Sequence, residues 1–260
     1  MKRSYKVVIP ARYASSRLPG KPLRELCGKP MLQYVFEAAS QSGAEQIVVA
    51  TDDQRIASVA HDFGADVCMT SPEHASGTDR LGEVLDIRDW PDETLVVNVQ
   101  GDEPLMPPAL IEQVAENLAQ SADASIATLA TPLVAAGEFF DSNVVKVVTD
   151  RDANALYFSR APIPWDRELL RDGQQALPVG IVALRHIGIY AYRGAYLRRY
   201  RQMRSCPLEQ TEQLEQLRAM WYGERIHVGL ASQRPGPGVD TEGDLRLVED
   251  LLRGRAQGEA

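Results

Sequence analysis

Residues 5–10 read YKVVIP and begin the part of the chain that decides the fold. This short, nearly continuous apolar run of β-branched type is typical of a parallel strand that is covered on both faces. The segment PARYASSRLPGKP, residues 10–22, follows it, and the next helical pattern starts only at Pro30. That gap of about 20 residues is far longer than the usual βα connection of about 2–6 residues. Long loops at the carboxyl end of such a strand bind ligands, so we expect a binding loop here.

Buried strands and amphipathic helices alternate through the first half of the chain. Apolar residues recur at helical spacing from Pro30, an expected first helical position, to Gly43. A second helix is expected between a cap at Asp52 or Asp53 and Gly64. Further strands are expected at residues 46–51, 66–69 and 94–100, and a further helix at residues 107–118. The alternation predicts an α/β fold with a mostly parallel, Rossmann-like nucleotide-binding sheet and right-handed crossovers.

The second half of the chain is less regular. The patterns at residues 144–149 and 186–192 alternate enough to predict antiparallel strands with one solvated face. Thr241 is expected to cap a final helix, with Asp244 in the capping-box position. The remaining expected elements are strands at 124–130 and 226–231, a helix at 208–221 and a polar surface loop at 166–180. The simplest architecture is a single domain over residues 1–260 with a β-rich insertion at about 130–205.

The charge of the chain is uneven. The formal net charge is −8, which argues against a protein that coats DNA or RNA, because that binding needs a positive face. The first 30 residues nevertheless hold eight basic side chains and one acidic side chain. A small anionic ligand near the N-terminus therefore fits the sequence better than a nucleic acid.

The cysteines and the apolar runs indicate the compartment. The chain has three cysteines with no C-x-x-C and no paired spacing, which favours a reducing environment. No apolar run approaches the roughly 18 residues of a membrane span, and no signal-peptide core opens the sequence. We therefore expect a cytoplasmic protein with no membrane partner.

The loop at residues 10–22 has the composition of a phosphate site. Arg12, Arg17 and Lys21 supply charge, Ser15 and Ser16 supply hydroxyl donors, and Gly20 permits a close approach of the backbone. Neither a Walker loop nor G-x-G-x-x-G is present, so a P-loop or a dinucleotide-binding motif is excluded. The alternative is a basic, solvated loop without a ligand.

Two acids follow expected strands elsewhere. Asp102 lies in QGDEP, residues 100–104, and Asp240 lies in GVDT, residues 238–241. Carboxylates from two loops at one sheet edge would suit Mg²⁺ held by one or two carboxylates together with substrate phosphates. Asp102 could instead cap the helix that follows it, whereas Thr241 already fills that role beside Asp240.

These motifs together resemble one enzyme family, the 3-deoxy-manno-octulosonate cytidylyltransferases or CMP-Kdo synthetases. The resemblance covers about residues 5–252, and PAR and GKP are shared with other sugar nucleotidyltransferases. The segment YFSRAPIPW with RHIGIYAYR is more specific. The stretches that carry it are PARYASSRLPGKPL (10–23), HASGTDRL (74–81), NVQGDEP (98–104), YFSRAPIPW (157–165), RHIGIYAYR (185–193), LEQLR (214–218) and GVDT (238–241).

The resemblance implies roles for individual residues. The residues implied to bind CTP are Pro10, Ala11, Arg12, Ser15, Arg17, Lys21, Ser76, Gly77, Thr78, Arg80 and Asp102. The residues implied to hold the octulosonate are Gln100, Arg160, His186, Tyr190, Glu215 and Gln216. Lys21, Arg17, Asp102 and Asp240 would be catalytic, and the two acids would bind Mg²⁺. Considered alone, His186 could equally be a core histidine, Tyr190 a packing residue and Glu215 a solvated surface acid.

The resemblance also implies a fold and a reaction. The fold would be of the nucleotide-diphospho-sugar transferase type. The reaction would transfer CMP from CTP to the anomeric hydroxyl of Kdo for lipopolysaccharide synthesis in Gram-negative bacteria, and the enzyme would be a homodimer joined through the β-rich insertion. Alternatives are a cytidylyltransferase for 8-amino Kdo or a nonulosonic acid, a metal-dependent glycosyltransferase, and a non-catalytic nucleotide sensor.

Overall fold

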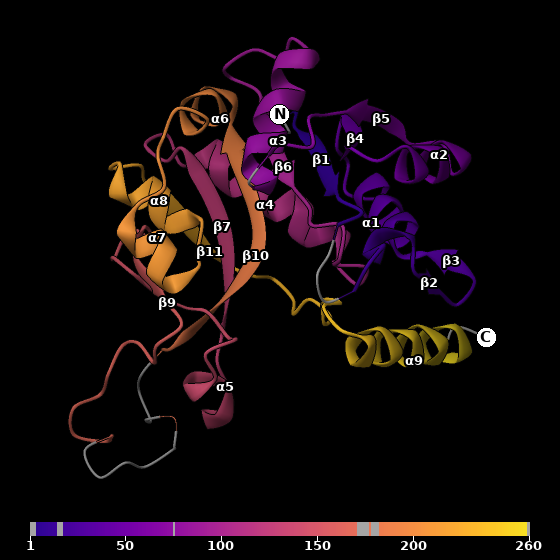
Figure 1. Cartoon of the computed structure of the whole chain (residues 1–260). Coiled ribbons are helices and arrows are strands. Elements are labelled where there is room, and N and C mark those ends of the chain that lie inside the picture. The colour runs from indigo at the N-terminus through magenta and orange to yellow at the C-terminus, as the bar shows by residue number, and fades with distance from the viewer. Residues whose placement is uncertain (1–3, 15–17, 75, 171–176, 178–181, 259–260) are drawn as a thin grey trace.

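The computed structural model describes residues 4–14, 18–74, 76–170, 177 and 182–258. Its central sheet has the strand order β11-β7-β10-β6-β1-β4-β5, and helices cover both faces (Figure 1). The strands are β1 (Lys6–Ala11), β4 (Gln46–Thr51), β5 (Asp66–Met69), β6 (Leu95–Asn98), β7 (Ile126–Pro132), β10 (Leu184–Arg193) and β11 (Ile226–Leu230). β10 runs antiparallel to β6 and β7, and the other neighbouring pairs along this order are parallel. The mostly parallel α/β prediction is therefore confirmed.

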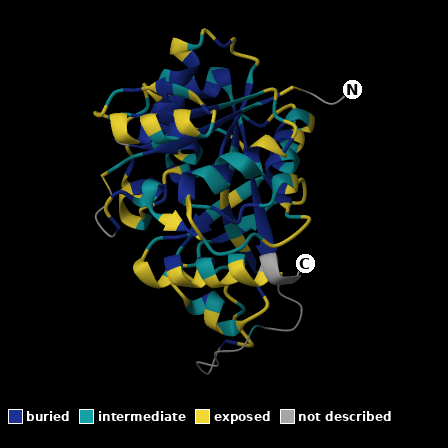
Figure 2. Cartoon of the chain, turned by 90° about the vertical axis from the view of Figure 1, so that its right-hand side faces the viewer, coloured by how far each residue is buried: buried dark blue, intermediate teal, exposed yellow. Residues whose placement is uncertain are grey.

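Alternate residues of the sheet build a core on each face. Val7 and Ile9 of β1 belong to one apolar cluster, and Val8 belongs to the other, because successive side chains of a strand point to opposite faces. The first cluster packs under α1 (Met31–Ser40), α2 (Gln54–Asp62) and α4 (Pro108–Gln120). The second packs under α3 (Gly77–Ile87), α6 (Gly194–Tyr200) and α8 (Gln216–Trp221). Figure 2 shows the buried strands between helices whose outer faces are exposed.

Local sequence signals set several boundaries correctly. β4 and β5 have the predicted bounds. Asp53 caps α2 by accepting a hydrogen bond from the N–H of Arg55 at 2.9 Å. Asp244 and Thr241 form the predicted capping box at α9 (Glu242–Gly258), with Thr241 N–H donating to the Asp244 carboxylate at 2.8 Å. Pro30 precedes α1 rather than starting it, which corrects its expected position by one residue.

The predicted helix at 208–221 is wrong in one respect, because it is two helices. α7 (Pro207–Glu212) ends where Gln213 adopts a left-handed conformation with φ of 54°, and α8 begins at Gln216. The break leaves Glu215 and Gln216 at the amino end of α8.

Several further elements are absent from the sequence prediction. They are η1 (Lys21–Leu23), β2 (Glu25–Leu26), β3 (Lys29–Pro30), α3, α5 (Ala136–Phe140), β9 (Ala155–Ser159) and α6. The short β2–β3 hairpin and η1 occupy part of the long connection after β1.

The region at about 130–205 contributes a strand to the central sheet as well as an extension beyond it. β10 lies between β7 and β6, and its far end pairs with β8 (Lys146–Thr149), which in turn pairs with β9. The antiparallel character predicted for residues 144–149 and 186–192 is confirmed, because β8 and β10 pair antiparallel with each other. β8 and β9 belong to the same sheet, off its main path, and β9 also contacts β11, while α5 lies beyond the far end of β10 (Figure 1). β10 itself is an internal strand. Within the described residues, no helix has the length and apolar character of a membrane span.

Candidate active site

A basic cavity of about 330 Å³ opens at the carboxyl ends of β1 and β6. These two strands are parallel neighbours, so the loops that follow them meet at one edge of the sheet. The cavity is lined by Pro10, Ala11, Arg12, Ala14, Lys21, Pro22, Gly77, Gln100, Gly101 and Asp102. Six of the residues predicted to bind CTP therefore lie together here. Ser15 and Arg17, which the sequence also assigns to CTP, lie outside the described residues.

The wall of this cavity depends on close backbone packing. A Cβ atom on Gly101 would lie 3.0 Å from the carbonyl oxygen of Pro10. Any larger residue would therefore push the turn after β6 away from the end of β1. The glycine lets Asp102 reach the same cavity as Arg12 and Lys21.

Arg12 presents a guanidinium that is incompletely satisfied. Its Nη2 is buried and has no hydrogen-bond partner among the described residues. Burial, with the neighbouring charge of Arg80, lowers the pKa of Arg12. An anion in the cavity would offer an acceptor oxygen to the unpartnered Nη2 and a negative charge to the buried guanidinium, so it would stabilise Arg12 in both respects.

Arg80 and Ser76 lie behind the cavity rather than on its described lining. Arg80 is fully buried and donates to Asp52 at 3.0 Å and to Thr70. Ser76 caps α3, where its hydroxyl accepts from the N–H of Asp79 at 3.1 Å. The positions predicted to read the nucleotide therefore hold the cavity wall in place, while Gly77 and Thr78 of the same motif reach the cavities.

Lys21 joins the two acids that the sequence singles out. Its Nζ donates to Asp102 Oδ2 at 2.8 Å and to Asp240 Oδ1 at 2.9 Å. The Lys21 side chain is 12% exposed, whereas the side chains of Asp102 and Asp240 are 36% and 51% exposed. Burial lowers the pKa of Lys21, but the two carboxylates outweigh that effect and raise it overall. The ammonium is therefore charged at neutral pH.

The backbone brings Asp240 to Asp102. The N–H of Val239 donates to the carbonyl of Asp102 at 2.9 Å, and the buried Val239 side chain packs in an apolar cluster with Leu105. A Cβ atom on Gly236 would lie 2.6 Å from Cβ of Leu105, so only glycine permits this packing. The spacing of the two carboxylates is therefore set by the main chain.

The acid pair fits a hard divalent cation. Among the described residues, no group of three or more His, Cys, Asp or Glu side chains is placed to hold a metal ion. Asp102 and Asp240 converge on one point that a cation already occupies, the Lys21 ammonium. Two carboxylates with open solvent access match Mg²⁺, which commonly takes one or two carboxylates and completes its shell with phosphate oxygens and water.

Glu103 is a neighbour that the sequence analysis did not single out. Burial, followed by the charge of Asp102, raises the pKa of Glu103 to about 8. At pH 7 this carboxyl is mostly neutral, so it adds little negative charge to the acid pair. The signal that could have identified Glu103 is its place next to Asp102 in the QGDEP motif.

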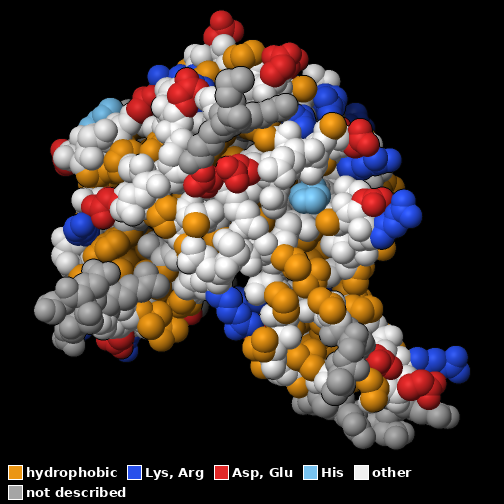
Figure 3. Space-filling view, turned by 180° about the vertical axis from the view of Figure 1, so that it is seen from behind, with side chains coloured by type: hydrophobic (Ala, Val, Ile, Leu, Met, Phe, Trp, Pro, Cys, Tyr) orange, Lys and Arg blue, Asp and Glu red, His pale blue; other side chains and the backbone are white. Residues whose placement is uncertain are grey.

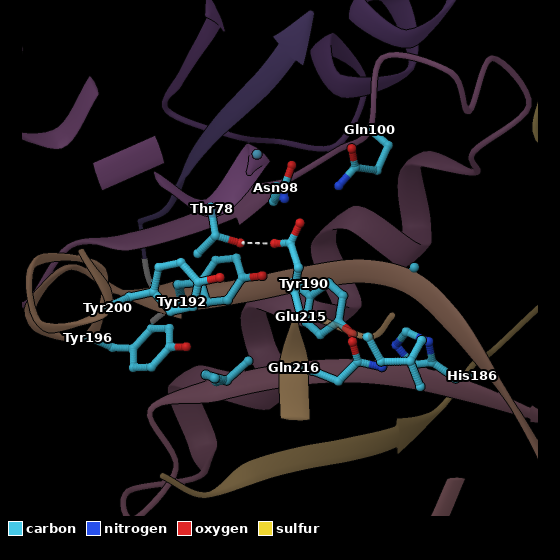
Figure 4. A pocket seen from close by; sticks show the side chains of 14 residues that line it. Thr78, Asn98, Gln100, His186, Tyr190, Tyr192, Tyr196, Tyr200, Glu215 and Gln216 are labelled. Carbon is cyan, nitrogen blue, oxygen red and sulfur yellow. Dashed lines mark hydrogen bonds between the residues drawn. The ribbon is translucent and has the colours of Figure 1, made fainter. Parts of the chain in front are cut away.

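A second cavity, of about 280 Å³, adjoins the first on the side of α3, α6 and α8. Gly77 and Gln100 line both cavities, so the two are neighbours. Five of the residues predicted to hold the sugar meet here: Gln100, His186, Tyr190, Glu215 and Gln216. Figure 4 shows His186 and Tyr190 coming from β10, facing Glu215 and Gln216 from the start of α8. The break between α7 and α8 is what turns the last two toward the cavity.

The second cavity is rich in unused hydrogen-bonding groups. Buried atoms without a partner among the described residues are Asn98 Oδ1, Tyr190 OH, Tyr200 OH and Gln216 Nε2. The Thr78 hydroxyl donates to Glu215 at 3.1 Å (Figure 4), and burial raises the pKa of Glu215 despite that bond. Buried polar groups without partners are rare, so their concentration here favours a site for a polar ligand or ordered water.

His186 is neutral in this setting. Burial lowers its pKa to about 3, and its Nε2 shares a hydrogen bond with the Thr128 hydroxyl at 3.0 Å. The edge of Phe158 packs against the imidazole with ring centroids 5.1 Å apart. His186 is buried in the core and also lines the cavity, so its interpretation as a core histidine is compatible with its interpretation as a sugar-site residue.

Arg160 does not lie on the described lining of either cavity. Its Nε donates to the carbonyl of Glu212 at 2.7 Å and its Nη1 to the carbonyl of Ser142 at 2.9 Å. Nη2 lies 3.5 Å from the carbonyl of Gln213. The guanidinium thus satisfies carbonyls at the end of α7, where a helix leaves such groups unpaired. This differs from the expected contact with the sugar.

Tyrosines form a wall of the second cavity, of which Tyr190 was predicted and Tyr192, Tyr196 and Tyr200 were not. Tyr192 stacks on Tyr190 and on Tyr196 with centroids 5.7 Å apart in both cases, and Tyr200 continues the row at 5.9 Å from Tyr196. The row runs from β10 into α6 and lines the cavity opposite Leu214 and Glu215. The signal was the spacing of tyrosines in YAYRGAYLRRY, which requires knowing that a strand passes directly into a helix.

The comparisons with known proteins agree with one another. A family model described as cytidylyltransferase matches residues 6–226. The 3-deoxy-manno-octulosonate cytidylyltransferase of Nitrosococcus oceani is 55% identical over 251 residues, which cover 96% of each chain. Those of Halorhodospira halophila and Vibrio vulnificus are 56% and 53% identical, and cover 96% and 97% of this chain and 97% and 100% of their own.

Solved structures extend the likeness to the fold. A CMP:2-keto-3-deoxy-manno-octonic acid synthetase complexed with CTP superimposes with a TM-score of 0.88 at 40% identity, covering 97% of this chain and 100% of the other. A nucleotidyl transferase from Methanothermobacter thermautotroptrophicus has a TM-score of 0.59 at 16% identity, covers 96% and 99%, and shares the fold alone.

Proposed function

This chain belongs to the cytidylyltransferase family, and from that premise we propose that it transfers CMP from CTP to the anomeric hydroxyl of Kdo. The observation that carries the proposal is the pair of adjoining cavities that share Gly77 and Gln100. One is basic and opens beside Lys21 and Asp102, and the other offers mainly neutral hydrogen-bonding groups. A triphosphate suits the first and a polyhydroxylated sugar acid suits the second.

The reaction joins the contents of the two cavities. The oxygen of the anomeric hydroxyl attacks the α-phosphorus of CTP, the bond from that phosphorus to the bridging oxygen breaks, and pyrophosphate leaves. The hydroxyl proton passes to solvent, and CMP-Kdo remains. No covalent enzyme intermediate is needed, so catalysis rests on positioning and on neutralising the phosphate charge.

The residues of the basic cavity divide this work. Arg12 supplies an unused Nη2 donor to a phosphate oxygen, and Lys21 supplies a charged ammonium. We assign Arg17 and Ser15 to the same triphosphate on the basis of the family motif. Asp102 and Asp240 would hold Mg²⁺, which when bound supplies Lewis-acid stabilisation to the reacting oxygens.

The residues of the second cavity orient the sugar. Gln100 stands at the boundary between the cavities, so it is placed to reach groups near the reacting hydroxyl. Tyr190 and Gln216 offer a hydroxyl and an amide that no described residue pairs with, and His186 offers a neutral imidazole. Glu215 accepts from Thr78 and has acceptor capacity left for a sugar hydroxyl.

A pyrophosphate-release assay tests the proposal. CTP with Kdo is expected to give rapid release, and UTP with Kdo or CTP with sialic acid is expected to give little. If turnover is faster with 8-amino Kdo or a nonulosonic acid than with Kdo, that acid is the substrate instead of Kdo. CTP binding that ignores Mg²⁺ and yields no pyrophosphate with any acid would favour a nucleotide sensor instead.

We also propose a homodimer, formed through the segment of the chain that carries α5, β8 and β9. Large apolar side chains are exposed on or near it, including Val134 at 70% and Leu156 at 60%, and Figure 3 shows hydrophobic side chains gathered on this lower part of the molecule. Light scattering after size exclusion is expected to give twice the chain mass, and a monomer at micromolar concentration would contradict the dimer. A cytoplasmic location and a product used in lipopolysaccharide synthesis complete the proposal, on the family resemblance.

A further inference from the structure

Lys21 occupies the point on which the two proposed metal ligands converge. Its Nζ lies 2.8 Å from Asp102 Oδ2 and 2.9 Å from Asp240 Oδ1, so one ammonium bridges carboxylates from loops 138 residues apart in sequence. The Lys21 side chain is only 12% exposed, whereas the two carboxylates that it bridges remain 36% and 51% exposed. Both oxygens that a metal ion would need are therefore engaged by a charge that belongs to the protein.

An ammonium and a divalent cation cannot share these oxygens without strong repulsion. Like charges at contact distance oppose each other, and the effect grows where water is excluded. A metal ion that binds between Asp102 and Asp240 must therefore displace the Lys21 ammonium from at least one of them. The free protein favours the lysine, because its Nζ donates a charged hydrogen bond to each carboxylate, at 2.8 Å and 2.9 Å.

The structure also provides a place for the displaced charge. Lys21 lines the basic cavity together with Arg12, so its flexible side chain can turn from the acids toward an anion bound there. Its main chain stays fixed, because Lys21 N–H donates to the carbonyl of Leu18 at 3.1 Å and its carbonyl accepts from Arg24 N–H at 3.1 Å. Only the side chain has to move.

We propose that Lys21 is a tethered counter-ion that fills the metal position of the free protein until nucleotide phosphates draw it away. Divalent metal then binds weakly to the free protein and strongly once the triphosphate is present. Lys21 thereby sets the order of binding, in addition to its contact with phosphate. The inference rests on the proposed function only in assigning a metal to Asp102 and Asp240.

The test is the affinity of the nucleotide-free protein for Mn²⁺, followed by the electron paramagnetic resonance signal of the unbound ion. Lys21→Met is expected to bind Mn²⁺ at least about tenfold more tightly than the natural protein, since removing an adjacent like charge shifts such equilibria by one order or more. Lys21→Arg keeps the charge and is expected to bind as weakly as the natural protein. Lys21→Gln serves as a second neutral variant if Lys21→Met fails to fold.

Two controls locate the effect. Arg12→Met removes one positive charge from the same cavity without touching the acids and is expected to change Mn²⁺ affinity by less than about threefold. Lys21→Met combined with Asp240→Asn is expected to lose the gain. Equal tightening in Arg12→Met, or no tightening in either neutral Lys21 variant, would overturn the proposal.

This experiment fails separately from the proposed function. If the protein releases pyrophosphate from CTP and Kdo but the neutral variants bind Mn²⁺ with unchanged affinity, the counter-ion proposal is wrong and the proposed activity is correct. Tighter Mn²⁺ binding in a protein that releases no pyrophosphate would do the reverse.

Discussion

The two cavities bind by different physics. The one at the ends of β1 and β6 is built from charged groups on loops, with Arg12, Lys21 and the two acids within reach of solvent. The one under α8 and the tyrosine row, which we call the neutral cavity, is lined mainly by uncharged groups with the Glu215 carboxyl among them, and its histidine carries no charge. Charged loops bind a highly charged phosphate, whereas a buried neutral pocket distinguishes sugars by their hydroxyl pattern. The difference predicts that substitutions in the two regions will fail in different ways.

The largest effect is expected beneath the neutral cavity. Arg218 lies over the ring of Tyr200 at 4.5 Å and donates to Glu209 at 2.8 Å, and both members of this ion pair are about nine-tenths buried. Glu209→Gln would leave the Arg218 charge buried without its partner and is expected to lower the free energy of unfolding by about 3–5 kcal/mol. Urea denaturation measures this.

The exposed pair of Lys29 and Glu37 gives the matched control. Glu37→Gln is expected to change the free energy of unfolding by no more than about 1 kcal/mol. Similar losses in both variants would mean that the neutral cavity has no special support from the buried pair.

The next effect concerns the charged cavity. Asp102→Asn is expected to lower kcat by at least about 10², or roughly 3 kcal/mol of transition-state stabilisation, because it weakens the proposed metal site. Asp240→Asn is expected to behave alike. Steady-state pyrophosphate release at saturating CTP and Mg²⁺ measures kcat. Asp123→Asn, which alters an exposed acid paired with Arg225, is the control, and near-normal turnover in Asp102→Asn would remove this residue from the metal site.

A smaller effect is expected from one hydroxyl in the neutral cavity. Tyr190→Phe removes a buried OH that has no partner in the described part of the chain, so it should raise KM for the sugar acid about fivefold and leave KM for CTP unchanged. Tyr222→Phe, at an exposed tyrosine outside the cavity, should change neither. An equal rise in both KM values for Tyr190→Phe would break the division between the two cavities.

The smallest effect is an expected constancy. Since burial holds the pKa of His186 at about 3, its imidazole should stay neutral as the pH falls from about 8 to 5. The NMR signal of its ring proton, assigned by its loss in His186→Gln, is expected not to move over that range. A titration midpoint near 6.5 would show that the cavity admits a charged imidazole after all.

The same contrast explains what the sequence could predict. The charged cavity is formed by short contiguous motifs at strand ends, so Arg12, Lys21 and Asp102 could be grouped from their positions after expected parallel strands and from the family resemblance. The Thr241 and Asp244 capping box is also local, and it appears as expected.

The neutral cavity is harder to predict because it is assembled from distant segments. The left-handed Gln213 that splits α7 from α8 has no composition signal, and Arg160 is drawn to carbonyls that only this break leaves free. Tyr190, Glu215 and Gln216 were identified through the family motifs, whereas Asn98 and the other three tyrosines of the row required the folded chain. Tertiary packing decides such positions more than local preference does.

The position of β10 has a consequence for folding of the chain during its synthesis on the ribosome. Residues 184–193 form the native neighbour of β6, yet they are synthesised about 90 residues later. Until they emerge, β6 presents an open edge of hydrogen-bonding groups, the kind of surface that aggregates. The amino-terminal half can collapse early, but its sheet is completed only late in translation, so we expect the nascent chain to be prone to aggregation until β10 has been synthesised.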